Sequence, residues 1–279
     1  MGIFDIFKKS EPKKPANIPA EPAKEENLAA PAAPAVQPVA EPKEEQKGYL
    51  GDLEKTQRIA ELLTLPREER DEQWVRQFLS DLPQASFRCG TPQIIAGPDG
   101  FPYFQIYLPE EGEKFQCYVV ERMIGDFLLE RGYGVVLNPG TGQPDWVLTY
   151  GDILNYHLHG DFLMQESFFS KSTQEEEIVS EGEEIMVGQP SEEILPFQTR
   201  KLLRDFFQLN GIDNPKVMLM MRKKGEDVTH DLVFNITPAQ FETETHYRNM
   251  MQTVTWYLPR YYSVVGLQDD GSENGFMAL

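Results

Sequence analysis

The 279-residue sequence contains only two cysteines and four histidines. Cys89 and Cys117 form no C-x-x-C pair, which excludes a disulfide framework and a zinc knuckle. We interpret them as buried thiols of a protein from a reducing compartment. No apolar run reaches the roughly 18 residues that cross a bilayer, and residues 1–9 lack the basic start and long apolar stretch of a secretory signal. These absences predict a cytoplasmic protein.

Basic residues are also scarce, with 26 Lys and Arg against 45 Asp and Glu. Residues 1–47 contain seven lysines and eight acidic residues, which leaves 19 basic and 37 acidic residues in 48–279, a net charge of −18. Such a body repels phosphate backbones, and no basic stripe with interleaved aromatics offsets that repulsion. Nucleic acid is therefore not an expected partner.

The N-terminal part has little apolar bulk. Residues 10–47 contain eight prolines and nine alanines, with Glu and Lys between them. Such a segment buries too little surface to offset its ordering entropy, so the sequence predicts a disordered, partly extended linker.

The linker follows a short amphipathic tip, residues 1–9. In a helix, Ile3, Phe4, Ile6 and Phe7 form an apolar cluster, while Asp5, Lys8 and Lys9 share the opposite face. Burying the four apolar side chains would give roughly 6–12 kcal/mol, whereas ordering the tip costs on the order of 9–18 kcal/mol. We therefore expect weak, reversible binding, either to a membrane surface or to an apolar groove on a protein.

From residue 48 the composition becomes globular, and two lobes are predicted, 48–170 and 194–279. The first lobe combines helical spacing around Ile59 and Trp74, a hairpin over 86–95 and 101–108, a helix that Gly132 ends, and the strand YGVVLN. The second combines a helix at 196–210, strands VMLMMR and HDLVFNI, a long helix and the strand YYSVVGL.

The long helix of the second lobe has a clear start signal, because Thr237 and Gln240 form a T-x-x-Q capping box. Both lobes thus predict an α/β (α+β) fold with the order α-β-β-α-β. RQFLSDL at 76–82 and RKLLRDF at 200–206 echo each other, which favours a duplication. Residues 171–193 contain eight Glu and one Lys, so a solvated linker loop is predicted between the lobes.

The segment HLHGD is the main candidate for chemistry. On a strand, His157, His159 and Asp161 would point to one face, as metal ligands must, and H-x-H-x-D opens a known metallohydrolase signature. The signature's next His is absent, because position 162 is Phe. The surrounding pattern favours a helix that ends at Gly160, and there His157 and His159 diverge by about 200°.

Other catalytic signatures are absent. NPGTGQPD lacks the Lys and Ser or Thr that complete a phosphate-binding loop, so we interpret it as a turn between two strands. The sequence contains no G-x-S-x-G elbow and no H-E-x-x-H motif. We therefore assign no catalytic residue and expect no cofactor.

Val136, Asn138, Pro139 and Gly140 form a V-x-N-P-G turn after a strand, and the second lobe ends in a hairpin, a helix and a final strand. In these features residues 70–270 resemble the bacterial enhanced-serine-sensitivity (SseB-like) proteins. The resemblance implies a bacterial cytoplasmic protein with a non-enzymatic role and carries over no catalytic residue. The long N-terminal segment departs from the compact family pattern.

Three functions remain open on the sequence. The first is a non-catalytic adaptor that binds a protein partner through its lobes and attaches elsewhere through its tip. The second is a metal-dependent hydrolase centred on His157, His159 and Asp161. The third is an acidic, secretion-type chaperone for a basic client.

Overall fold

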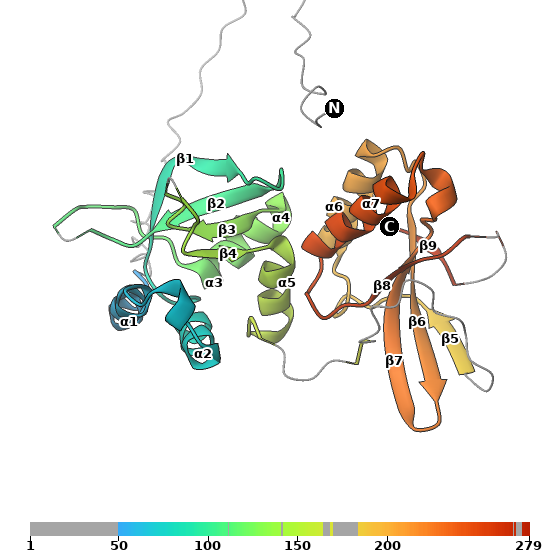
Figure 1. The fold of residues 1–279 in the computed structure, drawn as a ribbon, viewed down its shortest axis with the longest axis horizontal. Coiled ribbons are helices and arrows are strands. Elements are labelled where there is room, and N and C mark those ends of the chain that lie inside the picture. The colour runs from blue at the N-terminus through green and yellow to red at the C-terminus, as the bar shows by residue number, and fades with distance from the viewer. Residues whose placement is uncertain are drawn as a thin grey trace, which may run out of the picture. The chain divides into compact units, whose positions relative to one another are not determined.

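The computed structural model describes residues 50–110, 112–140, 142–163, 168–169, 184–269, 271 and 275–279. They form a mixed α+β fold with a four-stranded and a five-stranded sheet, as predicted (Figure 1). Gly48–Leu279 forms one compact unit. We use "first lobe" for the described residues up to 163 and "second lobe" for those from 168 onward.

The first lobe begins with two amphipathic helices. Asp52 caps α1 (Leu53–Leu63) by accepting hydrogen bonds from the Glu54 and Lys55 amides. Proline is typical of the first turn of a helix, but Pro66 precedes only a short 3-10 turn, η2 (Arg67–Glu69), and Asp71 caps α2 (Glu72–Asp81). The cause is the extended conformation of residue 70, which separates the two.

The first sheet has the order β1-β2-β3-β4. The predicted hairpin is confirmed as an antiparallel pair, and a helical crossover then leads to a parallel strand. The crossover contains a π-helical turn and ends at Gly132, as predicted, in a left-handed conformation. The elements of the first lobe after α2 are β1 (Arg88–Ala96), β2 (Pro102–Tyr107), α3 (Val120–Met123), η3 (Ile124–Leu128), α4 (Leu129–Arg131), β3 (Gly134–Leu137), β4 (Trp146–Leu148) and α5 (Tyr150–His159).

The second sheet has the order β5-β6-β7-β8, and β9 also pairs with β6. Its hairpin is again antiparallel, and its helical crossover again leads to a parallel strand. The predicted α-β-β-α-β order is therefore present in both lobes. The elements are β5 (Glu184–Gly188), α6 (Phe197–Leu209), β6 (Lys216–Lys224), β7 (Asp227–Phe234), η4 (Pro238–Gln240), α7 (Glu244–Trp256), β8 (Val264–Gly266) and β9 (Met277–Ala278).

Two boundaries differ from the sequence prediction. Residues 184–188 of the expected linker loop form strand β5, and residues 171–183 lie outside the described residues. The Thr237–Gln240 capping box forms as expected, but it caps η4, and α7 begins six residues later with Thr243 as its N-cap. Because Phe241 is extended, the two helices cannot be continuous, and Thr243 caps α7 by accepting a hydrogen bond from the His246 amide at 3.2 Å.

Candidate functional site

The HLHGD segment lies at the end of α5, where the sequence predicted a helix terminus. Gly160 ends the helix with φ 70° in the left-handed region, as expected. His157 and His159 lie in the exposed last turn, and the Asp161 carboxylate accepts a hydrogen bond from the Leu163 amide at 2.9 Å. The segment is helical, whereas a shared metal face requires a strand.

His159 has another contact. Its Nε2 lies 2.8 Å from the Tyr261 hydroxyl, in the second lobe. Among the residues that the structure describes, no group of three His, Cys, Asp or Glu side chains is placed to hold a metal ion. The geometry therefore gives His157, His159 and Asp161 no common ligand position.

The four tip residues, Ile3, Phe4, Ile6 and Phe7, lie outside the described residues, as does the linker 10–47. No helix in the described part of the chain is long and apolar enough to cross a membrane.

The two lobes meet through an aromatic contact that the sequence did not indicate. Trp256, at the end of α7, stacks on Phe101 with ring centroids 3.9 Å apart. Its indole N–H donates to the Tyr103 hydroxyl at 2.8 Å, and that hydroxyl donates to Asp99 at 2.6 Å. Trp256 is buried in the apolar core of the first lobe. The second lobe thus completes the core of the first.

Polar contacts extend this interface. Arg260 makes a bidentate ion pair with Asp152, at 2.7 and 2.8 Å, and this hydrogen bonding raises the arginine pKa. The Tyr150 hydroxyl lies 3.0 Å from the Thr199 hydroxyl, and burial raises the Tyr150 pKa to about 12. These contacts add hydrogen bonds and an ion pair to the aromatic packing between the lobes.

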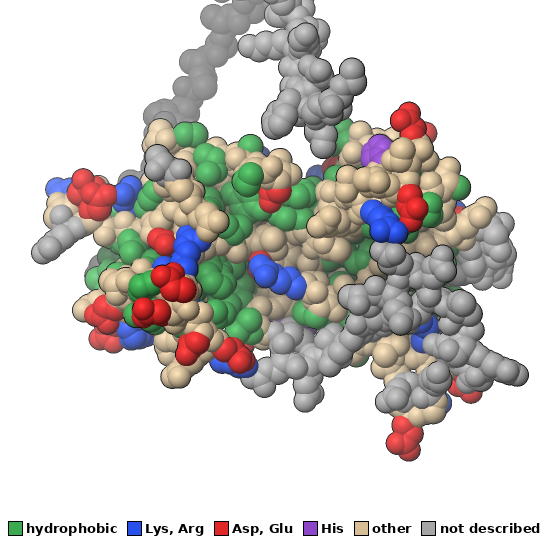
Figure 2. Space-filling view, in the orientation of Figure 1, with side chains coloured by type: hydrophobic (Ala, Val, Ile, Leu, Met, Phe, Trp, Pro, Cys, Tyr) green, Lys and Arg blue, Asp and Glu red, His purple; other side chains and the backbone are tan. Residues whose placement is uncertain are grey.

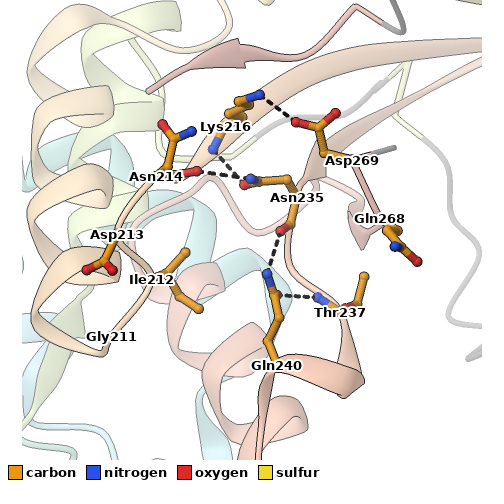
Figure 3. A pocket seen from close by; sticks show the side chains of 10 residues that line it. All are labelled: Gly211, Ile212, Asp213, Asn214, Lys216, Asn235, Thr237, Gln240, Gln268 and Asp269. Carbon is orange, nitrogen blue, oxygen red and sulfur yellow. Dashed lines mark hydrogen bonds and ion pairs between the residues drawn. The ribbon is translucent and has the colours of Figure 1, made fainter. Parts of the chain in front are cut away.

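A polar pocket of about 330 Å³ lies in the second lobe, beside the ends of β6 and β7 (Figure 3). The Asn235 side chain links two segments that line the pocket. It accepts a hydrogen bond from the Lys216 amide at 2.6 Å and donates one to the Asn214 carbonyl at 3.0 Å. Lys216 pairs with Asp269 at 2.5 Å, and Gln240 accepts from the Thr237 amide at 2.8 Å.

Most polar groups that Figure 3 labels are therefore satisfied by one another. A ligand would have to replace these bonds and would gain little net free energy from doing so. The arrangement fits a network that fastens the loops around the capping box better than a binding site. Only the box itself was foreseen from the sequence, because Lys216, Asn235 and Asp269 approach one another only in the fold.

The edges of the two sheets offer a more open surface, but three of them are unsuited to pairing. A register shift and Pro92 interrupt β1, and β4 and β8 have three residues each. Bulges, prolines and short strands are the devices by which proteins protect sheet edges.

Strand β5 has none of these protections. It pairs with β6 in continuous register from Glu184↔Lys223 to Gly188↔Leu219, and within the described residues it has no partner on its other side. Its five residues are all exposed. Ile185, Met186 and Val187 expose 41%, 48% and 45% of their surface, so this edge combines free backbone groups with apolar side chains.

Comparisons with protein-family models, curated proteins and solved structures each gave no match. The resemblance to the enhanced-serine-sensitivity proteins therefore stays a prediction.

Proposed function

We propose that this chain is a non-catalytic adaptor of the bacterial cytoplasm, similar in role to the SseB-like proteins, which binds an extended segment of a protein partner along β5. The observation that carries the proposal is the regular, apolar and unprotected edge of β5 beside three edges that are interrupted or short. Adding a strand to such an edge satisfies its free backbone groups and covers its side chains.

The partner segment is expected to be basic. Residues 48–279 carry a net charge of −18, and Glu184, at the start of β5, is exposed. Lysine or arginine side chains on an incoming strand would be attracted to this body, and like charges would be repelled.

The expected affinity is modest. Covering three half-exposed apolar side chains contributes roughly 2–4 kcal/mol, and each new backbone hydrogen bond adds about 1 kcal/mol. A five-residue strand can form about four to five such bonds and association costs at least about 4 kcal/mol, so the net of roughly 2–5 kcal/mol corresponds to a dissociation constant of about a millimolar or weaker. Such binding is reversible, as an adaptor requires. In this proposal the tip, residues 1–9, adds a second weak attachment at the inner membrane surface or on another protein.

Titration of the full chain with a synthetic peptide of alternating lysine and valine tests the proposal. We expect saturable binding and slower amide hydrogen exchange at residues 184–188. Met186→Lys places a repelling charge on the edge and should weaken binding about tenfold or more.

The matched control is Val228→Lys, which adds the same charge to a strand residue that is 41% exposed but lies on β7, opposite Lys223 in the β6–β7 hairpin and away from β5. Its binding should change less than about twofold, since surface charges act weakly at a distance. Equal losses in the two variants, or no binding to the unmodified chain, would contradict the proposal.

A further inference from the structure

A second pocket, of about 530 Å³, lies where η2 and the start of α2 approach β4, and Arg260 from the second lobe contributes to its wall. Basic and aromatic side chains line it together: Arg67, Arg70, Arg260, Trp74 and Trp146. Figure 2 shows basic side chains on both sides of an apolar area over the first lobe. The three arginines lie on a body, residues 48–279, whose net charge is −18.

The three arginines differ in how far their charges are compensated. Arg260 is paired with Asp152, and Arg70 lies 3.6 Å from the Asp145 carboxylate with its guanidinium 4.7 Å from the Trp74 ring centre. Arg67 donates only to the Gln143 side chain and to the backbone carbonyls of Gln143 and Pro144. Three arginines against these two carboxylates leave one positive charge, and it lies at Arg67.

Trp146, which lines the pocket, carries a buried indole N–H that has no hydrogen-bond partner among the described residues. An unsatisfied buried donor costs free energy, but this N–H is shielded from solvent, so a ligand would reach it only if the Trp146 side chain moved. Guanidinium and indole groups are donors only, so they favour a ligand atom that accepts and carries negative charge.

We propose that this pocket binds a single carboxylate of an acidic peptide whose neighbouring side chain is apolar. The carboxylate is expected to meet Arg67, and the apolar side chain the Trp74–Trp146 wall, whose ring centroids lie 5.8 Å apart. This site is separate from β5 and does not rest on the proposed function.

The charge balance favours a carboxylate over a phosphate. One net positive charge matches one carboxylate, whereas a dianionic phosphate would bring excess negative charge close to Asp145 and Asp152. A phosphate has no apolar surface to place against the aromatic wall, whereas a Leu or Val side chain can be buried there.

The test is a titration of the full chain with the peptide Ac-Val-Glu-Leu-NH2. Binding is measured by calorimetry and by the shift of the NMR signal of the Trp146 indole N–H. Ac-Val-Gln-Leu-NH2 and inorganic phosphate serve as comparison ligands. We expect saturable binding of the glutamate peptide with a shift of the Trp146 signal, and binding at least about fivefold weaker for the glutamine peptide.

Arg67→Gln should weaken the glutamate peptide at least about fivefold. The matched control is Arg76→Gln, which removes the same charge from an exposed position on α2 whose partner is Glu72. If Arg67→Gln does not fold, as judged by circular dichroism, the difference between the two peptides on the unmodified chain still tests the proposal. Equal binding of the two peptides, equal losses in Arg67→Gln and Arg76→Gln, or binding of phosphate alone would overturn the proposal.

Discussion

The two lobes share one topology and differ in the edge to which a fourth strand is added. In each lobe an antiparallel hairpin is followed by a helical crossover to a parallel strand. The first lobe adds β4 beside the last of these strands, whereas the second adds β5 beside the first. The shared three-stranded arrangement can therefore take an additional strand beside either of its outer strands.

The difference gives the two added strands different surroundings. In the first lobe, β4 continues into α5, the helix that contacts the second lobe. In the second lobe, β5 is fully exposed and its outer side faces no described strand. We infer that the first lobe uses its added strand to join the lobes, and that the second keeps its added strand for a partner.

The sharpest way to break this comparison is to separate the lobes with Trp256→Ala. Removal of a buried tryptophan from a core typically costs about 3–5 kcal/mol. We expect a loss of this size in chemical unfolding, and two transitions in place of one, because the first lobe loses its aromatic contact with the second and the remaining polar contacts are weaker. Phe197→Ala, at an α6 position that is 62% exposed, should change stability by less than about 0.5 kcal/mol. A small loss in Trp256→Ala would show that the lobes are stable independently.

A smaller disturbance of the same interface is Gly151→Ala. A Cβ atom at this position would lie 2.0 Å from the Leu258 carbonyl oxygen, so α5 would have to move away from the second lobe. Overpacking of this kind costs about 1–3 kcal/mol, measurable by thermal unfolding. Gly142→Ala meets no atom within 4 Å and should leave the melting temperature nearly unchanged. Similar losses in the two variants would argue against a tight lobe contact.

Asp81 and Asp205 sharpen the comparison further, because the sequence echo aligns them. Asp81 is buried and accepts hydrogen bonds from Arg58 at 2.8 and 3.0 Å, whereas Asp205 is half-exposed beside Arg204. Asp81→Asn should lower the free energy of unfolding by about 1–2 kcal/mol, a range that allows for the solvent exposure of Arg58. Asp205→Asn should lower it by less than about 0.5 kcal/mol.

Asp81 also predicts that the stability of the chain depends on pH. Burial raises the pKa of Asp81, but the hydrogen bonds from Arg58 and Gln77 outweigh it and lower the pKa overall. Its stabilisation is therefore complete above the unfolded-state pKa of about 4 and is lost as the pH falls through the lower folded-state value. Unfolding between pH 6 and about 2 should be less dependent on pH in Asp81→Asn than in the unmodified chain. Identical profiles would contradict the assignment.

The smallest expected effect on stability is that of deleting residues 2–9. The melting temperature of the lobes should stay within about 1 °C, since the tip is expected to contribute nothing to either core. Co-sedimentation with anionic lipid vesicles should be lost if the tip binds a membrane surface. Unchanged co-sedimentation would refute that attachment.

The order of elements could be predicted because it depends on local periodicity. Helical spacing around Phe78 and Leu203, and strand-like runs on either side of a turn signal, predicted the elements of both lobes. The offset between the helices of the two lobes that the sequence echo indicates differs by one position from the offset between their buried residues. The fully buried pairs Phe78 with Leu82 and Leu203 with Phe207 are 125 positions apart, whereas the sequence echo gave 124.

Long-range features could not be predicted in this way. Strand β5 lies in a glutamate-rich stretch whose composition favours a loop, and only its pairing with β6 makes it a strand. The contact of Trp256 with Phe101 joins residues that are far apart in sequence, so no local signal marks it. The arginine pocket combines residues from η2, β4 and the second lobe for the same reason.

The position of Trp256 has a consequence for synthesis of the chain. A ribosome produces Phe101 and Tyr103 long before Trp256, so the nascent first lobe has a vacant place in its apolar interior. That vacancy exposes aromatic surface until α7 has emerged. Folding of the first lobe is thus completed only after α7 has been synthesised, and truncated chains that end before residue 256 should aggregate.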